Sequence, residues 1–292
     1  MRELLAPTQT MHDIVAALDS GSAVPYLGPG MLALAGQNCP LPASPEHLVD
    51  RLTAKATVPY KIRKNLTAAA QFIENFKHRR TVKTAMTEAF RSSVPPTELH
   101  CLLAALPALP LVVHAWYDDL PQKALAARKS WGIVQGVSQA EHFGNWVHYF
   151  NADGTQAPVE AANWETLLYQ PFGSISPAAN FLVSDSDYVE VLTEIDIQTP
   201  IPEAVVKLRT GRHFVFLGCR FATQLDRIFA RQIMKRSSAK HWAVLPEQPT
   251  KNEARFLAEQ NIERIDLSLY HFADALESSR EDVVSEPLAL GG

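Results

Sequence analysis

The stretch LPLVVHA at residues 109–115 indicates the fold class of this chain. Its apolar side chains follow one another without the alternation of a half-exposed strand. Such continuity is typical of a strand that helices cover on both faces of a parallel sheet. Similar short apolar runs predict further strands at 23–27, 132–134, 146–150, 166–169, 213–217, 242–245 and 262–267.

Segments with helical spacing separate many of these runs, notably at 98–106, 202–208, 222–234 and 252–259 and from Phe272 onward. Strands that alternate with helices are joined by right-handed crossovers, which place successive strands parallel to one another. The sequence therefore predicts an α/β protein with a Rossmann-like, doubly wound and mostly parallel sheet.

The 292 residues suffice for one large domain with a substantial core. We expect a single domain over 1–283, followed by a flexible C-terminal tail at 284–292. A helical pattern with a polar side runs from about 44 to 91, with Ser44 as a plausible cap, and predicts a helical insert packed over the sheet. Pro25 lies inside the first apolar run and argues against a central strand there, unless it is the first residue of that strand.

The composition excludes several classes of partner. A net charge of −4 offers no basic field for nucleic acid or an anionic membrane, and the basic cluster at 77–80 is interpreted as a solvated helix end. The most apolar stretch, 101–113, is too short to span a bilayer. Glu3 and Asp13 interrupt the N-terminus, so no signal peptide is expected. Three scattered cysteines without a C-x-x-C pair predict buried thiols, no structural zinc and a cytoplasmic protein.

Two glycine turns follow predicted strands and are candidate ligand sites. Residues 28–31, Gly-Pro-Gly-Met, form a strand–glycine–helix turn of the kind that binds a pyrophosphate through backbone amides. Pro29 has no N–H, and Met31 places a long side chain in or near the pocket. Gly218 either lets a ribose or adenine approach the backbone or makes a tight turn. Cys219 is interpreted as a buried thiol rather than a nucleophile, because no base is identifiable.

Six segments in order resemble the SIR2-like, or sirtuin-related, family of NAD-binding domains. They are the turn at 28–31, PTELH at 96–100, WYDDL at 116–120, FGSI at 172–175, FLVSDSDY at 181–188 and FVFLGC at 214–219. The resemblance extends over residues 12–275 and implies a cleft for NAD or a related nucleotide. It implies that the cofactor-binding residues are Gly28, Pro29, Gly30, Met31, Tyr117, Asp118, Gly173, Ser174, Gly218 and Cys219.

The resemblance fails at the residues that carry the family's chemistry. Trp116 stands where the family has an asparagine that positions the nicotinamide ribose and a water. Phe172 stands where the family has its general-base histidine, and a phenyl ring cannot accept a proton. His114 lies two residues before Trp116, so on a strand it would share that residue's face and is the nearest candidate to restore catalysis. Asp118 is a candidate to hold a ribose or carboxamide, and Asp119 a candidate to cap the helix that follows.

Two functions follow from this contrast. The preferred interpretation is a catalytically impaired SIR2-like pseudoenzyme that has no catalytic residues. It would bind a nucleotide without turnover, or carry a plugged pocket and bind a protein partner or further copies of itself. The alternative is an active NAD hydrolase that cleaves the nicotinamide–ribose bond with displaced groups, possibly in bacterial defence. A protein deacylase is the least favoured, because zinc ribbon, histidine and asparagine are all missing.

Overall fold

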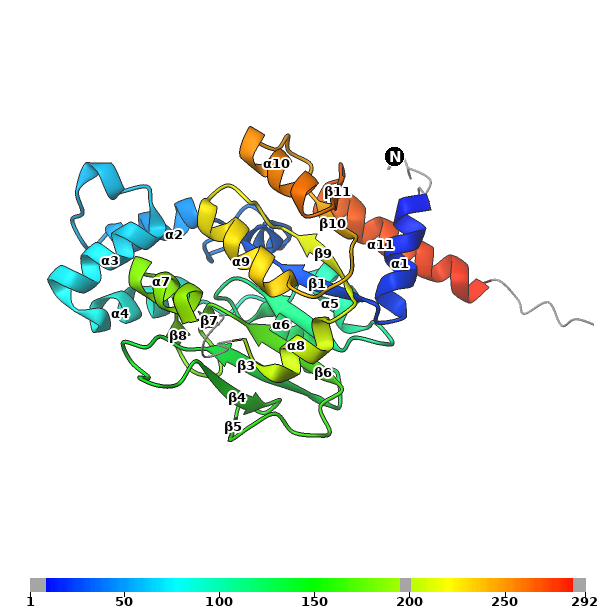
Figure 1. Cartoon of the computed structure of the whole chain (residues 1–292), viewed down its shortest axis with the longest axis horizontal. Helices are drawn as coiled ribbons and strands as arrows, with labels where there is room; N and C mark the ends of the chain where they lie inside the picture. The colour runs from blue at the N-terminus through cyan, green and yellow to red at the C-terminus, as the bar shows by residue number, and fades with distance from the viewer. Residues whose placement is uncertain (1–8, 195–200, 286–292) are drawn as a thin grey trace, which may run out of the picture.

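The computed structural model describes residues 9–194 and 201–285 and confirms the predicted α/β architecture (Figure 1). A nine-stranded sheet has the order β11-β10-β9-β1-β2-β6-β3-β4-β5. The strands from β11 to β3 pair in parallel, and β4 and β5 add an antiparallel edge. Their bounds are β1 Ala23–Leu27, β2 Leu111–His114, β3 Trp131–Gly136, β4 Val147–Asn151, β5 Gln156–Ala157, β6 Thr166–Gln170, β9 His213–Leu217, β10 His241–Val244 and β11 Ile262–Ile265.

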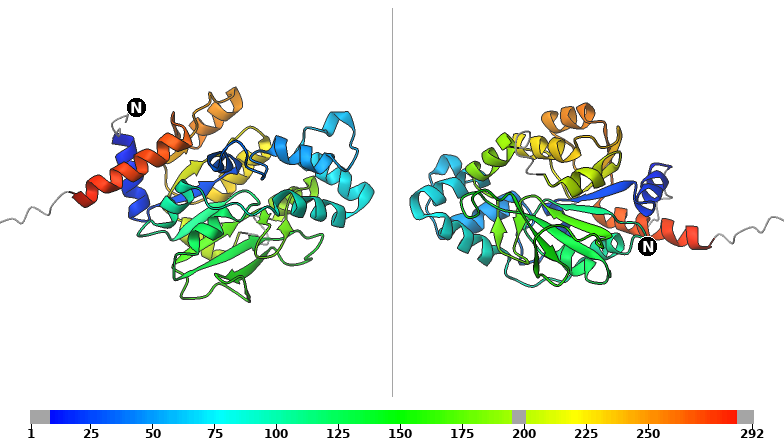
Figure 2. Two further views of the ribbon diagram at one scale, coloured as in Figure 1. Left: turned by 180° about the vertical axis from the view of Figure 1, so that it is seen from behind. Right: turned by 60° about the horizontal axis from the view of Figure 1, so that its bottom comes forward.

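Helices cover both faces of the sheet, as the two views of Figure 2 show. One face, called the α11 face, packs against α1 Gln9–Asp19, α5 Glu98–Ala104, α6 Leu120–Leu125 and α11 Leu269–Ser285. The opposite face, called the α9 face, packs against α7 Asp185–Glu194, α8 Glu203–Arg209, α9 Gln224–Met234 and α10 Lys251–Glu259. Successive residues of β2 illustrate the division, because Val112 joins the core of the α11 face and Val113 that of the α9 face. This double burial explains the continuous apolarity of 109–115.

Residues 44–91 form helices, as predicted. They comprise α2 Pro45–Thr53, the short 3₁₀ helix η2 Tyr60–Ile62, α3 Leu66–Lys77 and α4 Arg79–Phe90. Ser44 and Asn65 cap α2 and α3 by accepting hydrogen bonds from backbone amides. The α2, α3 and α4 helices contact one another, and α3 also contacts α7. Their apolar sides join the core of the α9 face, so this insert is continuous with the main core.

Pro25 is the third residue of β1, a central strand between β9 and β2, so the argument against a central strand was wrong. The Leu27 carbonyl accepts a hydrogen bond from the amide of Ala115, the residue after β2. Backbone polar groups along a strand point alternately to its two neighbours, so the backbone nitrogen of Pro25, two residues earlier, also faces β2. Pairing with β2 begins only at Tyr26 opposite Val113. The missing N–H of the proline thus falls before that ladder starts, which removes its cost.

Three smaller expectations differ from the structure. Cys101 is exposed rather than buried, because it lies on the outer side of α5. The α11 helix continues to Ser285, so the first two residues of the expected tail are helical, and 286–292 lie outside the described residues. The strand at 146–150 is an antiparallel neighbour of β3. Among the described residues, no helix is long and apolar enough to cross a membrane.

Candidate nucleotide cleft at the carboxyl edge of the sheet

The predicted site residues gather at the carboxyl ends of β1, β9, β2 and β6, in two groups. In the first, the turn after β1 lies against the turn after β9, where Gly218 and Cys219 are found. In the second, the segment after β2 is held by residues 173–175 after β6. The two groups meet where the Ala115 amide donates to the Leu27 carbonyl at 2.8 Å. This is the edge at which parallel α/β sheets bind ligands.

The amides of the first glycine turn are already engaged within the chain. Gly28 N–H donates to the Leu217 carbonyl at 2.8 Å, and Gly30 N–H donates to the Gly218 carbonyl at 2.9 Å. Met31 N–H donates back to the Gly28 carbonyl at 3.2 Å, which opens the 3₁₀ helix η1 Pro29–Ala35. Pro29 has no N–H to offer. In this conformation the turn therefore presents no amide to a phosphate.

Close packing of two backbones explains the three glycines. A Cβ at Gly28 would lie 2.6 Å from the Gly218 carbonyl oxygen, and one at Gly30 would lie 2.8 Å from the same atom. Gly218 has φ of +65°, and a Cβ there would lie 2.4 Å from the Met31 nitrogen. The close approach predicted for Gly218 is thus to the neighbouring turn. The Met31 side chain is buried in the core of the α11 face.

Trp116 is buried and points toward the insert. Its indole Nε1 donates to the Pro42 carbonyl at 2.8 Å, which satisfies the ring's one polar group. The Phe90 ring of α4 meets it edge-on with ring centroids 6.0 Å apart. The Trp116 side chain therefore holds the insert against the end of β2.

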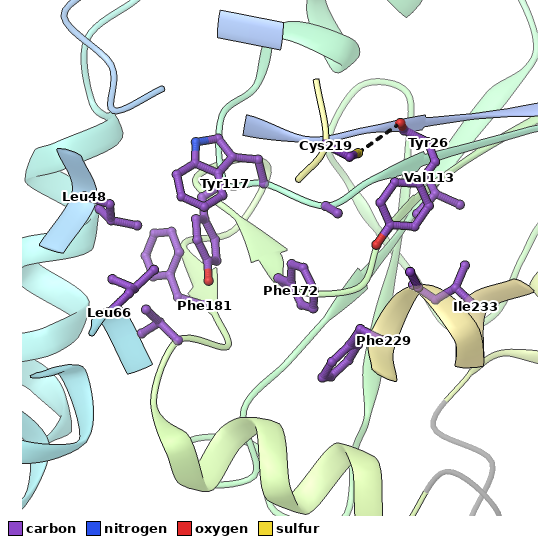
Figure 3. Close-up of a cluster of buried hydrophobic side chains, with 14 of the residues drawn as sticks. Tyr26, Leu48, Leu66, Val113, Tyr117, Phe172, Phe181, Cys219, Phe229 and Ile233 are labelled. Carbon is purple, nitrogen blue, oxygen red and sulfur yellow. Dashed lines mark hydrogen bonds between the residues drawn. The ribbon is translucent and has the colours of Figure 1, made fainter. Parts of the chain in front are cut away.

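Phe172 lies beside Phe229 on the α9 face (Figure 3), and Tyr188 completes a cluster of three rings. Its centroid lies 5.3 Å from that of Tyr188 in α7 and 5.0 Å from that of Phe229 in α9, and these two rings are 5.1 Å apart. Only 9% of Phe172 is exposed. The Phe172 ring therefore packs α7 and α9 against the sheet.

Tyr117 and Ser174 hold the backbone rather than face a cavity. The Tyr117 hydroxyl donates to the Leu182 carbonyl at 2.7 Å, and burial raises the pKa of this phenol. Ser174 Oγ donates to the carbonyls of Tyr117 and Asp118 at 3.1 and 3.0 Å. Gly173 has φ of +77°, and a Cβ there would lie 2.1 Å from the Asn180 carbonyl oxygen. Residues 173 and 174 thus clasp the segment after β2.

Asp118 and His114 form a buried pair under α6. Asp118 Oδ2 lies 3.2 Å from His114 Nε2, and Oδ1 accepts from the Leu120 amide at 3.0 Å. Burial alone would raise the pKa of Asp118, but His114, His100 and the Leu120 amide together lower it. Asp118, rather than the expected Asp119, therefore caps the helix.

The expectation that His114 shares a face with Trp116 is wrong, because β2 ends at His114 and the chain turns immediately afterwards. His114 is 1% exposed, and its Nδ1 has no hydrogen-bond partner among the described residues. Nδ1 of nearby His100 shares a hydrogen bond with the Thr97 hydroxyl at 2.7 Å. Burial lowers the pKa of His100 to about 4.

A family model described as the SIR2-like domain matches residues 110–265, more than half of the chain. This chain belongs to the SIR2-like family. Membership indicates a function related to NAD or a similar nucleotide. No curated protein matches the sequence. The first glycine turn precedes the matched segment, whereas the segments around Trp116, Phe172 and Gly218 lie within it.

Cys219 of this SIR2-like chain has the environment of an inert thiol. Burial raises its pKa, with a smaller contribution from Asp226. Its Sγ lies 3.6 Å from the Tyr26 carbonyl oxygen and 3.5 Å from that of Leu217. A protonated, buried thiol is a poor nucleophile. Among the described residues, no group of three or more His, Cys, Asp or Glu side chains is arranged to hold a metal ion.

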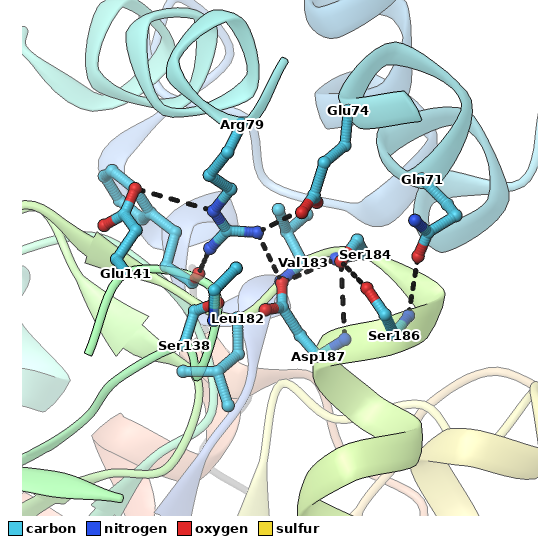
Figure 4. Close-up of polar contacts among 12 residues, drawn as sticks. Gln71, Glu74, Arg79, Ser138, Glu141, Leu182, Val183, Ser184, Ser186 and Asp187 are labelled. Atoms are coloured by element: carbon cyan, nitrogen blue, oxygen red, sulfur yellow. Dashed lines mark hydrogen bonds and ion pairs between the residues drawn. The ribbon is translucent and has the colours of Figure 1, made fainter. Parts of the chain in front are cut away.

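Sequence reasoning missed a buried ion network that joins the insert to the SIR2-like core (Figure 4). Arg79 Nη1 lies 2.8 Å from Asp187 Oδ2 and 3.2 Å from Glu74 Oε2, and its Nε lies 3.5 Å from Glu141 Oε1. Asp187 Oδ2 also accepts hydrogen bonds from the backbone amides of Val183 and Ser184, and Ser184 lies directly before α7. The cluster at 77–80 was interpreted as solvated, but the Arg79 side chain is only 13% exposed. The acidic DSD at 185–187 was the one signal that could have indicated a partner.

A small cavity of about 10 Å³ remains beside the three-ring cluster, lined by residues that include Gly136, Tyr169, Pro171 and Phe229. Such a volume holds about one water molecule. Pockets that take cofactors are typically about 300 Å³ or larger. This cavity is therefore too small to hold a dinucleotide.

Proposed function

We propose that this SIR2-like protein acts by binding a protein partner and does not turn over NAD. One observation carries the proposal. The two positions at which the family places its asparagine and its histidine hold Trp116 and Phe172, and both rings are packed into the core. Neither ring can exchange a proton at neutral pH, so general-base chemistry at these positions is impossible.

The engaged glycine turn supports the same proposal independently. A dinucleotide needs donors for its phosphates, and the amides of Gly28, Gly30 and Met31 are bonded to carbonyls of the chain itself. Rearranging them would also separate two turns that touch through Gly218. We infer that the cleft is closed, and that binding of NAD without turnover is the less favoured form of the proposal.

Of the six strongly exposed large apolar side chains among the described residues, four lie on or beside the insert, whereas Val159 and Tyr270 lie elsewhere. Tyr60 and Phe76 of the insert are 89% and 72% exposed. Phe143 is 93% exposed and lies two residues after Glu141, which forms an ion pair with Lys83 of α4. Val189 is 59% exposed and lies on α7, which contacts α3. Exposed apolar side chains that gather on one region are typical of interaction surfaces. The insert region is therefore the proposed partner surface, for another protein or for a second copy of this chain.

The buried pair of Asp118 and His114 is the one observation in favour of an active NAD hydrolase. A histidine beside a carboxylate is the arrangement of a general base with its orienting group. However, this pair lies under α6, whereas Phe172 lies on the α9 face. His114 thus does not replace the missing base at the family's position.

Turnover is tested by incubating the full-length protein with excess NAD and measuring nicotinamide and ADP-ribose by chromatography. We expect no product above the no-enzyme background, with an unrelated NAD-cleaving enzyme as positive control. Product formation that disappears in Asp118→Asn would overturn the proposal in favour of the hydrolase. Asparagine keeps the shape of the side chain, removes its charge and replaces one acceptor oxygen by an NH2 donor.

Binding is tested by thermal denaturation with NAD, ADP-ribose and ATP. A ligand present at 100 times its dissociation constant stabilises a protein by about 2.7 kcal/mol. We expect NAD to raise the melting temperature no more than ADP-ribose and ATP do. Light scattering of the wild type and of Phe76→Ser then separates the two kinds of partner, because loss of a dimer or larger species identifies self-association.

A further inference from the structure

A second concave site is lined by residues at the carboxyl ends of α9 and α10 and before β10 and β11. This is the edge of the sheet opposite the cleft. The groove has a volume of about 510 Å³ and is open to solvent. Its size falls in the range of small-molecule sites, roughly 300–1,000 Å³. Neither the SIR2-like motifs nor the proposed partner surface accounts for it.

The groove is positively charged in a protein whose net charge is −4. Arg231, Lys235 and Arg236 line it, and all three side chains are exposed. The only acidic lining residue is Glu259, which is paired with Arg255 at 2.7 Å. The local charge therefore favours an anion.

Arg209 removes the main objection to an anion at this place. A helix carboxyl end ordinarily disfavours negative charge, because its last carbonyls point outward. At α9, Arg209 Nη1 donates to the carbonyls of Gln232 and Ile233 at 2.7 and 2.8 Å. Burial lowers the pKa of Arg209, and repulsion from Arg236 acts in the same direction. The positive charges here repel one another, and a bound anion would relieve that repulsion.

The groove also contains a hydroxyl whose hydrogen is directed by its neighbours. The Phe214 amide donates to His241 Nδ1 at 3.0 Å, so Nδ1 must be unprotonated. Burial lowers the pKa of His241 to about 4, and the neutral ring therefore carries its hydrogen on Nε2. Nε2 lies 3.3 Å from Ser237 Oγ, which consequently accepts. The Ser237 hydroxyl hydrogen then remains for an acceptor in the groove.

The backbone is strained at two lining residues. Arg236 has φ of +67° and Asn261 has φ of +52°, and they are two of the three non-glycine residues with positive φ among those described. Asparagine tolerates this region, but a residue with a long side chain is less favoured there than glycine. Glycine would adopt the Arg236 conformation without strain. Arg236 lies in the tight turn after α9, where the Ser237 amide donates to the Met234 carbonyl at 2.9 Å, so Arg236→Gly removes the side chain without straining this turn.

We propose that this groove binds a small molecule carrying two or more phosphate groups, with Arg231, Arg236 and Ser237 as its direct ligands. Arginine forks match phosphate oxygens in pairs, and the serine hydroxyl adds a third donor. No Phe, Tyr or Trp lines the groove among the described residues, so recognition rests on the phosphates rather than on a stacked base.

Sodium tripolyphosphate is the probe, titrated calorimetrically into the full-length protein at constant ionic strength. The informative variant is Arg236→Gly, which removes the ligand and relieves the strained φ. We expect Arg236→Gly to melt at the same temperature as the wild type or higher, and to bind the probe about tenfold or more weakly, the scale of a lost charged hydrogen bond. Arg231→Gln should weaken binding similarly, whereas Lys129→Gln, an exposed cation outside the groove, should leave it unchanged.

Equal binding by the wild type and Arg236→Gly would overturn the proposal. So would a response to sulfate equal to that to tripolyphosphate, because it would indicate screening of surface charge only. ATP should bind with an affinity close to that of tripolyphosphate. Binding of ATP without binding of tripolyphosphate would place nucleotide recognition elsewhere. These outcomes are independent of NAD turnover, so either proposal can fail alone.

Discussion

Replacing Phe172 by alanine tests whether the cleft is closed by tight packing. The substitution removes a phenyl ring that lies 5.3 Å from Tyr188 and 5.0 Å from Phe229 and is only 9% exposed. Roughly 100 Å² of apolar surface at about 25 cal/mol per Å² corresponds to about 2.5 kcal/mol. The space left behind adds to this loss, since the Tyr188 and Phe229 rings belong to separate helices. We therefore expect the free energy of unfolding to fall by about 3 kcal/mol.

The measurement is urea denaturation followed by circular dichroism and tryptophan fluorescence, with the slope of the transition held in common. Phe172→Leu is the matched control, because leucine refills much of the space and should be less destabilising, by about 1.5 kcal/mol or less. A double-mutant cycle with Phe229→Ala should give a coupling of about 0.5–1.5 kcal/mol for the ring pair. A loss below about 1 kcal/mol in Phe172→Ala with an unchanged slope would refute the reasoning, because the ring would then not be packed.

Three further predictions concern the network, the glycine turns and pH. Arg79→Met should cost about 3 kcal/mol in urea denaturation, because it leaves Asp187 buried with only its backbone donors; a loss under 1 kcal/mol would contradict a buried network. Gly218→Ala should lower the free energy of unfolding by about 3 kcal/mol, and Gly211→Ala by only about 1 kcal/mol. Both glycines have positive φ, but only at Gly218 would the added Cβ meet backbone atoms, so equal losses would exclude the close approach. His100 has a folded pKa of about 4, so the unfolded chain takes up its proton first as pH falls. Stability should therefore decline between about pH 6.5 and pH 4, less steeply in His100→Gln, and identical profiles would show that this ring is accessible in the fold.

The sequence predicted the sheet well because its strands are buried on both faces and stand out as apolar runs. Most of the helices between them were equally recognisable and differ only at their ends, but α7 at Asp185–Glu194 was not predicted. Pro25 was misjudged because its effect depends on where the ladder to β2 begins, which is a property of register. Arg79 was misjudged because three of the four residues at 77–80 are outside the network, and its partner Asp187 lies 108 residues away.

The predicted site residues lie together at one edge of the sheet, but the sequence did not predict their contacts. Gly28 and Gly218 follow adjacent parallel strands, so their convergence at one edge follows from the topology. That they touch each other rather than a ligand depends on a separation of a few ångström, which no pattern contains. The direction of Trp116 was equally inaccessible, because its hydrogen-bond partner Pro42 lies 74 residues earlier in an irregular segment. His114 was assigned to the wrong face because alternation was extended beyond the last residue of β2.

The engaged amides and the packed rings reinforce each other energetically. A nucleotide entering the cleft must displace the Phe172 ring, at a cost of about 3 kcal/mol, before it gains any contact. An opening cost of that size weakens the apparent affinity roughly 150-fold, because only the open fraction binds. Hydrogen bonds to phosphate would replace those that Gly28 and Gly30 now make to the chain, so these amides add little in compensation. A protein with a histidine at position 172 would recover catalysis in return for that opening cost. Under the proposed function, this chain would recover no general-base chemistry there, because Phe172 cannot accept a proton.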